Sequence, residues 1–321
     1  MSSAPGPRAE AIGLDVGGTK IAAMRVRADG EIRAAETVPT PADDMAATLQ
    51  AMVAAAEAVR TSAVVAVGVG AAGLVEKATG ILTFAPNLAW RDAKITQYVS
   101  GALGLPTLAD NDANVAAWGE FRFGAGRGHD DMLLVTVGTG IGGGIVSGGR
   151  LFRGAHGFAA EIGHIIVEPN GPVCGCGNRG CWEQVASGNA IVRAGREAAV
   201  EHPHSTIAKL AAGDPTNVTG PLVTEAAASG DDVALGILAE VGRRLGEGVA
   251  GLVNVLDPSV VVVGGGAIAA GEMLLASARV AFIDALEAPE HRPRVPIVPA
   301  ELGNDAGGVG AAALALEELS G

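Results

Sequence analysis

Three apolar runs of this chain stop at glycine. They are AIGLDVGG (11–18), DMLLVTVGTGIGGG (131–144) and PSVVVVGGG (258–266). A short run rich in Val, Ile and Leu that ends in glycine is typical of a buried strand entering a tight turn. A fourth run, AVVAVGVGAAG (63–73), has the same form. The chain is therefore predicted to contain several buried strands, each followed by a glycine turn.

Hairpins and helices lie between these strands. Asp29 and Gly30 interrupt a period-2 stretch and mark a hairpin, and residues 105–124 are predicted to form a strand, a loop and a helix. Four longer segments are predicted to be helical: 43–60, 187–199, 231–254 and 305–319. Strands that alternate with helices and hairpins predict an α/β fold of two domains, with mixed sheets and a cleft between the domains.

The composition limits the class of protein. Aromatic residues make up only 3% of the chain although 49% of it is hydrophobic, so the cores must be built from Ala, Val, Leu and Ile. The formal net charge is −13 and no run of Lys and Arg occurs, which argues against a nucleic-acid partner. A small polyanionic ligand is compatible with this charge, because backbone N–H groups at glycine turns bind phosphate.

No targeting segment is evident in the sequence. The stretch MSSAPGPRAEA (1–11) lacks the pattern of a signal peptide, and no apolar run approaches the length that spans a bilayer. We therefore expect a cytoplasmic location and no membrane partner. In that compartment, clustered cysteines indicate metal or redox chemistry more often than disulfides.

The first glycine turn has the sequence DVGGTK (15–20). Backbone N–H groups at Gly17 and Gly18 could approach a phosphate, Thr19 offers a hydroxyl, and Asp15 could hold Mg²⁺ or its water shell. The motif ends in Thr-Lys and is therefore not a Walker A loop. From these residues alone, an ordinary hairpin is an equal alternative.

The second glycine turn, VGTGIGGG (137–144), formally contains G-x-G-x-x-G. The dinucleotide fingerprint requires a helix to begin inside such a loop, but IVSGGRLFRG follows here and predicts a returning strand. A second phosphate-binding hairpin is therefore favoured over a Rossmann site.

The stretch ADNDANVAA (109–117) joins a predicted strand to a predicted helix. Asp112 at this position could serve as a general base for an alcohol that attacks a phosphoryl group. Asp112 or Asn114 could equally act only as a helix N-cap, and this stretch alone favours the cap.

All three cysteines fall in CGCGNRGC (174–181), and His164 lies ten residues before the first of them. One imidazole and three thiolates form a Cys₃His set, which is typical of a closed structural zinc site. A redox C-x-C pair is the main alternative, but it leaves the third cysteine and the histidine unexplained. Zinc binding here would bring Glu161 and Glu183 close together, where they could bind sugar hydroxyls; solvated surface acids are the alternative.

Taken together, these stretches resemble the ROK family of sugar kinases and sugar-sensing repressors. The resemblance runs from Ile12 to about Leu319 and rests on the order and spacing of its motifs. The motifs are LDVGGTK, GAAGL, DND, VGTGIGGG, EIGH, CGCGNRGCWE and VVVVGGG. Within that family the chain looks most like the bacterial zinc-containing, ATP-dependent glucokinases.

The resemblance implies an actin-like ATPase (ribonuclease H-like) fold, with Asp112 as the base that deprotonates the sugar 6-hydroxyl. The implied sugar contacts are Gly73, Asn87, Asn111, Asp112, Glu161, His164 and Glu183. The implied ATP and phosphate contacts are Asp15, Gly17, Gly18, Thr19, Lys20, Gly138, Thr139, Gly140, Gly142, Gly143, Gly264, Gly265 and Gly266. The implied zinc ligands are His164, Cys174, Cys176 and Cys181.

The resemblance also implies MgATP and glucose as ligands, a homodimer or homotetramer, and two domains. We expect a smaller domain at 10–112 plus 305–321, and a larger one at 113–304 that carries the zinc loop and the dimerisation surface. Because the first strand begins near residue 11, we expect no winged-helix DNA-binding domain ahead of it.

Several activities stay open at this point. The acceptor could be N-acetylglucosamine, N-acetylmannosamine, mannose or fructose in place of glucose, and polyphosphate could replace ATP. A non-catalytic sugar sensor is the alternative from another class, although the Asn111–Asp112 pair and two phosphate loops argue against it.

Overall fold

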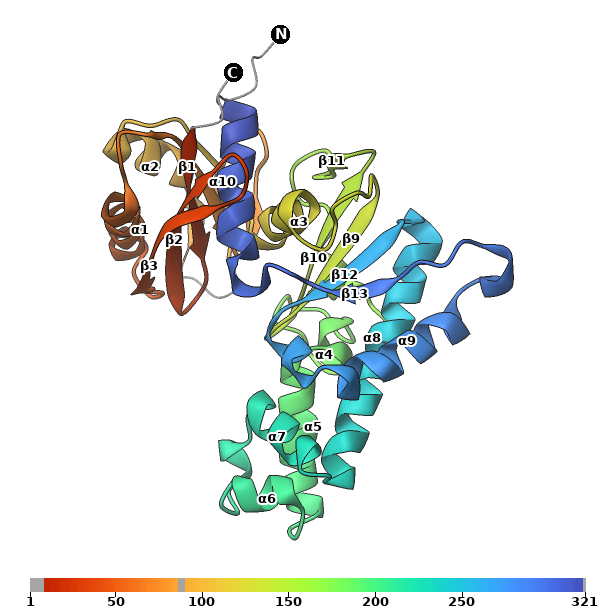
Figure 1. Ribbon diagram of the computed structural model, residues 1–321. Coiled ribbons are helices and arrows are strands. Elements are labelled where there is room, and N and C mark those ends of the chain that lie inside the picture. Colours follow the sequence, from red (N-terminus) through yellow and green to blue (C-terminus); the bar gives the residue numbers. More distant parts are fainter. Residues whose placement is uncertain (1–8, 86–89, 320–321) are drawn as a thin grey trace. The chain divides into compact units, whose positions relative to one another are not determined.

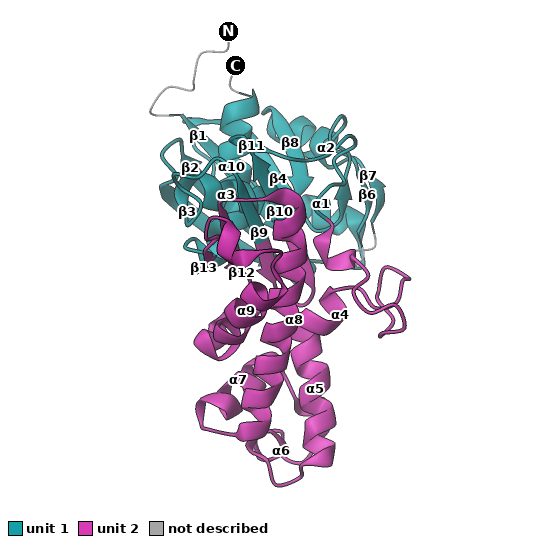
Figure 2. Cartoon of the chain, turned by 90° about the vertical axis from the view of Figure 1, so that its right-hand side faces the viewer, with its two compact units in different colours: residues 1–134, 143–160, 300–321 teal, residues 135–142, 161–299 magenta. Residues whose placement is uncertain are grey.

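The computed structural model describes residues 9–85 and 90–319 of the chain (Figure 1). The described parts of residues 1–134, 143–160 and 300–321 form one compact unit, unit 1, and residues 135–142 and 161–299 form a second, unit 2 (Figure 2).

A five-stranded sheet in the order β3-β2-β1-β4-β8 is the centre of unit 1. The first three strands are antiparallel, whereas β4 and β8 run parallel to β1. This mixed sheet has the ribonuclease H-like arrangement of the predicted actin-like ATPase fold. The strands are β1 (Glu10–Val16), β2 (Lys20–Arg27), β3 (Ile32–Pro39), β4 (Val64–Ala71) and β8 (Thr107–Asn111).

Helices cover both faces of this sheet, with α1 and α2 on one face and α10 on the other (Figure 1). The helices of unit 1 are α1 (Met45–Val59), α2 (Ile95–Leu103), α3 (Asp112–Phe123) and α10 (Ala306–Leu319). A small antiparallel sheet adds β5 (Leu74–Val75), β6 (Leu82–Phe84) and β7 (Arg91–Ala93).

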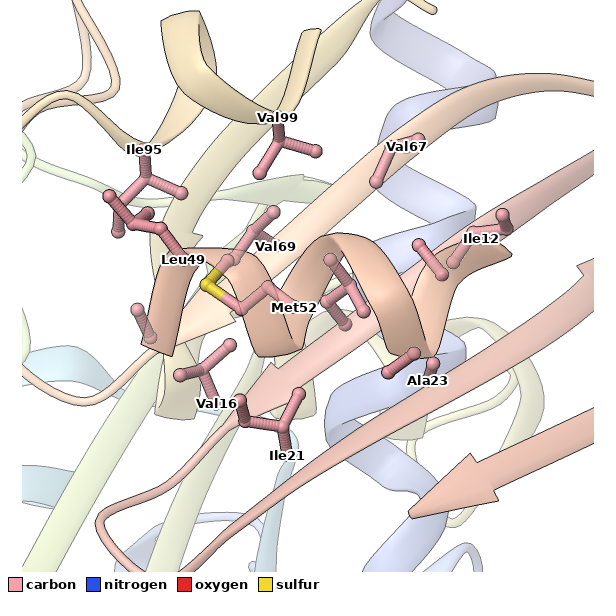
Figure 3. Close-up of a cluster of buried hydrophobic side chains, with 14 of the residues drawn as sticks. Ile12, Val16, Ile21, Ala23, Leu49, Met52, Val67, Val69, Ile95 and Val99 are labelled. Atoms are coloured by element: carbon pink, nitrogen blue, oxygen red, sulfur yellow. The ribbon is translucent and has the colours of Figure 1, made fainter. Parts of the chain in front are cut away.

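Period-2 alternation along β1 divides the core of unit 1 into two. Ile12 and Val16 face the cluster that contains Leu49 and Met52 of α1 (Figure 3). Ala11 belongs to the second cluster, on the α10 face. Because successive side chains of a strand point to opposite faces, one buried strand supplies both cores.

Helix α10 lies so close to the sheet that side chains are excluded from part of the contact. A Cβ placed on Gly13 of β1 would lie 1.8 Å from the carbonyl oxygen of Gly308, and one on Gly68 of β4 would lie 1.9 Å from that of Ala311. Glycine is therefore required at both strand positions.

The second five-stranded sheet has the order β11-β10-β9-β12-β13. Its strands are β9 (Met132–Val137), β10 (Ile141–Ser147), β11 (Arg150–Leu151), β12 (Val260–Gly264) and β13 (Ile297–Pro299). The boundary between the units passes within β9 and β10. The segment after VGTGIGGG is thus a returning strand, as predicted, and no helix begins in that loop.

The helices of unit 2 pack mainly on one another (Figure 2). They are α4 (Glu183–Ala186), α5 (Gly188–Glu201), α6 (Thr206–Leu210), α7 (Gly220–Ala228), α8 (Asp232–Leu256) and α9 (Glu272–Ala285). Among the residues that the structure describes, no helix combines the length and apolar character needed to cross a membrane.

The division into units differs from the expected domain ranges. Residues 113–134, 143–160 and 300–304 were expected in the larger domain, but these three segments belong to unit 1. For the segment that begins at residue 113, the reason is that α3 packs along α10, where a Cβ on Gly310 would lie 1.7 Å from the Val115 carbonyl oxygen. This packing joins the segment after Asp112 to unit 1.

Candidate active site and metal centre

The DVGGTK turn links β1 to β2 at one end of the unit 1 sheet. The Gly17 N–H donates to the Lys20 carbonyl at 3.0 Å, and the Thr40 hydroxyl donates to the Gly17 carbonyl at 2.8 Å. Thr19 and Lys20 are exposed. The turn is therefore held by its own backbone and by Thr40. The Thr19 hydroxyl and the Lys20 ammonium group are accessible to solvent.

Asp15 lies near the end of β1 and is largely shielded from solvent. Burial, then repulsion by Asp112, raises its pKa from 3.8 to about 6, and Lys20 offsets this only in part. A Cβ on Gly307 would lie 2.9 Å from Oδ2 of Asp15, so the carboxylate rests against the first turn of α10. Only glycine leaves room for Asp15 in this position.

The Asn111–Asp112 pair lies where β8 runs directly into α3, without the predicted loop. Asn111 is the N-cap of α3, because its side-chain oxygen accepts hydrogen bonds from the backbone N–H groups of Ala113 and Asn114. The Asn111 amide nitrogen donates to the Gly73 carbonyl at 3.0 Å. Since Asn111 performs the capping, neither Asp112 nor Asn114 is the N-cap.

Asp112 is the first residue of α3. Burial raises the pKa of its carboxyl above the ordinary value, despite hydrogen bonds from the backbone N–H groups of Ala113 and of Asp112 itself. Two carboxylates with raised pKa, Asp15 and Asp112, thus lie near one another with Lys20 as the opposing charge. Mg²⁺ prefers oxygen ligands, and a cation beside these carboxylates would offset the burial and repulsion that raise their pKa values.

The sequence reasoning missed a buried ion pair next to these residues. Asp110 and Arg153 have side chains 6% and 11% exposed, and Arg153 Nε lies 2.5 Å from Asp110 Oδ2. The two residues are 43 positions apart in the chain. The DND motif gave one signal, since it places a third polar residue beside Asn111, but it did not identify the partner.

In unit 2, the second glycine turn (138–140) connects β9 to β10. The Gly138 and Thr139 carbonyls accept hydrogen bonds from the N–H groups of Gly188 and Asn189, at 2.8 and 3.3 Å, so the start of α5 holds this turn. Thr139 is exposed. The remaining glycines of this motif, Gly142 and Gly143, lie within β10.

The VVVVGGG motif ends close to that turn. Gly265 has φ +89°, and a Cβ on it would lie 2.5 Å from the carbonyl oxygen of Val137, the last residue of β9. Gly265 and Gly266 are exposed, whereas Gly264 ends β12 and is buried. The structure therefore brings two of the predicted nucleotide motifs together in unit 2.

His164, Cys174, Cys176 and Cys181 form a cluster. Their candidate donor atoms all lie within 4.8 Å of one another, with Cys174 Sγ 3.6 Å from His164 Nδ1 and Cys176 Sγ 3.6 Å from Cys181 Sγ. Tetrahedral zinc with Zn–S bonds of about 2.3 Å requires ligand separations of about 3.8 Å. The donor set and its spacing therefore fit zinc.

The three thiols differ in how readily they ionise. Burial raises the pKa of Cys174 to about 12, and burial also raises the pKa of Cys181. Burial acts in the same direction on Cys176, but hydrogen bonds from the Asn178 N–H and the other thiols outweigh it and lower its pKa. Cys176 is also the exposed thiol of the three.

Two acids lie on opposite sides of His164. Glu183 Oε1 is 3.9 Å from Nδ1, the nitrogen that faces Cys174, and Glu161 Oε2 is 3.9 Å from Nε2. The Cys174 thiol also donates to Glu183 at 2.9 Å. The predicted convergence of Glu161, His164 and Glu183 is therefore found, with Nε2 as the imidazole nitrogen that faces away from the thiols.

The predicted site residues fall into two sets. Asp15, the DVGGTK turn, Gly73, Asn111 and Asp112 belong to unit 1, together with Gly143. The cysteine cluster, its two acids, residues 138–142 and residues 264–266 belong to unit 2. Asn87 lies outside the described residues.

Comparison with known proteins identifies the family. The profile of the ROK family matches residues 11–318. The glucokinase of Streptomyces coelicolor is 44% identical over 309 residues, which cover 95% of this chain and 97% of that protein, and the glucokinase of Thermotoga maritima is 37% identical over 98% and 100%. A crystal structure of a ROK family glucokinase from Streptomyces griseus, in complex with glucose and AMPPNP, has a TM-score of 0.88 and 44% identity over 96% of this chain and 99% of that one. The chain therefore belongs to the ROK family.

Proposed function

We propose that this protein is a glucokinase, which transfers the γ-phosphoryl group of ATP to the 6-hydroxyl of glucose. Full-length similarity to glucokinases supports this proposal, as does the glucose and AMPPNP complex of the Streptomyces griseus relative. The observation that carries it is the state of Asp112: a carboxyl whose pKa burial raises, at the first position of a helix that Asn111 caps.

Asp112 is the general base in this proposal. Phosphoryl transfer depends mainly on positioning and charge neutralisation, and the attacking hydroxyl needs a carboxylate to accept its proton. A raised pKa makes Asp112 a better proton acceptor than an ordinary aspartate. Asn111 and Gly73, which are hydrogen-bonded to each other, are proposed sugar contacts beside it.

The glycine turns are the proposed phosphate contacts. Backbone N–H groups at 17–18 and 138–140, together with the hydroxyls of Thr19 and Thr139, would bind phosphate oxygens, and Lys20 would add positive charge. Asp15 would hold Mg²⁺ or its water shell, and the cation would neutralise charge on the phosphates. Gly264, Gly265 and Gly266 are proposed to lie beside the adenosine.

Glu161, His164 and Glu183 are the proposed sugar contacts of unit 2. His164 Nδ1 would bind zinc together with the three cysteines, which leaves Nε2 to hydrogen-bond a sugar hydroxyl. Four protein ligands leave no open position on the metal, so we assign zinc a structural role. Cysteines that bind zinc and form no disulfide fit a cytoplasmic location. We also expect a homodimer or homotetramer.

A hexose panel tests the proposed reaction. ADP release is measured with ATP and glucose, mannose, fructose, N-acetylglucosamine or N-acetylmannosamine, and then with polyphosphate in place of ATP. We expect the highest kcat/KM with glucose and ATP. A higher kcat/KM with another hexose would identify that hexose as the preferred substrate. No ADP release with any sugar would favour a non-catalytic sugar sensor.

The variant Asp112→Asn tests the base. A positioned base contributes a factor of about 10² to 10⁴ in rate, so kcat should fall by that factor. Glucose affinity, measured by calorimetry, should stay close to wild type, and the unfolding midpoint should not fall, because the substitution removes a buried charge. Turnover at the wild-type rate would remove Asp112 from the mechanism.

A further inference from the structure

The buried ion pair of Asp110 and Arg153 is not explained by the proposed chemistry. Arg153 follows β11, and its guanidinium contacts two acids: Nε lies 2.5 Å from Asp110, and a terminal nitrogen donates to Glu318 of α10 at 2.8 Å. The Asp110 carboxylate is almost fully buried at the end of β8, whereas the Glu318 side chain is 47% exposed. The guanidinium therefore has one buried partner and one exposed partner.

The other oxygen of Asp110 reaches the residues on both sides of Asp112. Asp110 Oδ1 accepts a hydrogen bond from the backbone N–H of Asn111 at 2.8 Å and from the side-chain amide of Asn114 at 2.9 Å. Asn111 caps α3, and Asn114 lies in its first turn. The orientation of the Asp110 carboxylate therefore constrains the turn that carries Asp112.

Stability alone is a weak reason for this ion pair. Removing two charges from water costs free energy that their attraction often fails to recover, and apolar pairs of similar volume are frequently more stable. The planar guanidinium of Arg153, by contrast, is held between two acids, Asp110 through Nε and Glu318 through a terminal nitrogen, and so fixes the position of Asp110 Oδ2. The arrangement is better explained by geometry than by stability.

We propose that Arg153 is a positioning residue for phosphoryl transfer. It fixes the Asp110 carboxylate, which holds Asn111 and Asn114 and so sets the direction of the Asp112 side chain. This inference rests on the proposed role of Asp112 as the base. Arg153 acts on the reaction only through Asp110.

The first test is the double variant Arg153→Met/Asp110→Asn. Removal of both charges together avoids an unpaired buried carboxylate, and the new amide oxygen can still accept from Asn111. We expect the unfolding midpoint to stay close to wild type and kcat to fall about 10- to 100-fold, because small displacements of catalytic groups cost factors of this size. A wild-type kcat in the folded double variant would overturn the proposal.

Three single variants refine that result. Arg153→Lys keeps the charge without the planar guanidinium that contacts both acids, and it should recover part of the kcat that Arg153→Met loses. The matched control is Glu318→Gln, which removes the exposed partner of the same guanidinium and should keep wild-type kcat. If Glu318→Gln lowers kcat as much as Arg153→Met, Arg153 anchors α10 and is not a positioning residue for Asp112.

Combination with Asp112→Asn separates positioning from a general structural effect. If Arg153 acts through Asp112, adding Arg153→Met/Asp110→Asn to Asp112→Asn should lower kcat no further. The same 10- to 100-fold factor in both backgrounds would overturn the proposal. An active Asp112→Asn single variant would instead refute the proposed base, so the two failures are distinguishable.

Discussion

Asp15 is an acid held where its charge is disfavoured. Its side chain rests against Gly307 at the start of α10, and Asp112 repels it. Burial is the larger cause of the rise in its pKa, and Lys20 compensates only partly. When it is ionised and no cation is bound, such a group lowers the free energy of unfolding. Groups of this kind are common in binding sites.

This arrangement predicts a pH dependence of stability. Between pH 3.8 and about 6 the folded protein binds more protons at Asp15 than the unfolded chain does, so this residue lowers the free energy of unfolding as pH rises through that window. The variant Asp15→Asn should therefore gain stability relative to wild type over the same window, by up to about 3 kcal/mol. Urea unfolding in Mg²⁺-free buffer at several pH values measures the difference.

Asp214 provides a control of opposite sign. Its carboxylate is exposed, and hydrogen bonds from the Thr216 hydroxyl and N–H lower its pKa. The stability deficit of Asp214→Asn relative to wild type should grow as pH rises toward 3.8 and stay constant above it, because the lowered pKa places the difference in bound protons below 3.8. A difference between Asp15→Asn and wild type that does not change with pH would contradict the assigned environment of Asp15.

The metal-site residues found from the sequence share one property: their partners are near in the chain. His164 and the three cysteines lie within 18 positions, so their residue types and spacing alone indicated a metal site. Arg153 and Asp110 are 43 positions apart, and Gly307 meets Asp15 across almost the whole chain. Pairs of this kind depend on sheet order and helix packing, which no local pattern contains.

At the scale of elements, Glu183 connects the metal cluster to the second phosphate turn. Its Oε1 accepts from Cys174, and its Oε2 lies 2.3 Å from the position that a Cβ on Gly140 would occupy. The start of α5, a few residues after Glu183, donates hydrogen bonds to the same turn. The loop that carries the three cysteines and the turn at 138–140 are thus parts of one packed structure in unit 2.

The variant Gly140→Ala should therefore act on sugar binding. The added methyl group displaces the end of the flexible Glu183 side chain, so we expect little loss of stability but a weaker affinity for glucose, by about tenfold for the loss of one hydrogen bond to a charged group. Calorimetric titration with glucose measures this change. Gly138→Ala places the same methyl group in open space and should leave glucose affinity unchanged. Equal effects of the two variants would argue against this role of Glu183.

The strands and helices themselves were largely predictable. The runs AIGLDVGG and PSVVVVGGG form the strands β1 and β12, which end at or next to the first glycine of the turn. The helices predicted at 43–60, 231–254 and 305–319 are found as α1, α8 and α10. The expected domain ranges differ from the units because α3 packs on α10 through Gly119 and Gly310. In the sequence these glycines are indistinguishable from helix-weakening residues.

At the scale of the whole molecule, each unit carries its own tryptophan reporters. Trp90 and Trp118 lie in unit 1, and Trp182 lies in unit 2, directly after the proposed zinc ligand Cys181. The Trp182 ring packs on Gly248 of α8 and donates a hydrogen bond to the Arg244 carbonyl at 2.9 Å. The fluorescence of Trp182 should therefore report whether the cysteine loop stays packed on α8.

Metal removal should destabilise unit 2 and leave unit 1 unchanged. A ligand that binds only the folded state stabilises it by about 2.7 kcal/mol when its free concentration is 100 times Kd, so chelation of zinc should lower the urea midpoint of unit 2 accordingly. The variant Trp90→Phe/Trp118→Phe reports this through Trp182 fluorescence, and Trp182→Phe reports unit 1. Zinc added back should restore the first midpoint, and Cys176→Ser should abolish that recovery. If chelation shifts both midpoints equally, the stabilising effect of the metal extends over the whole chain and is not confined to the unit that binds it.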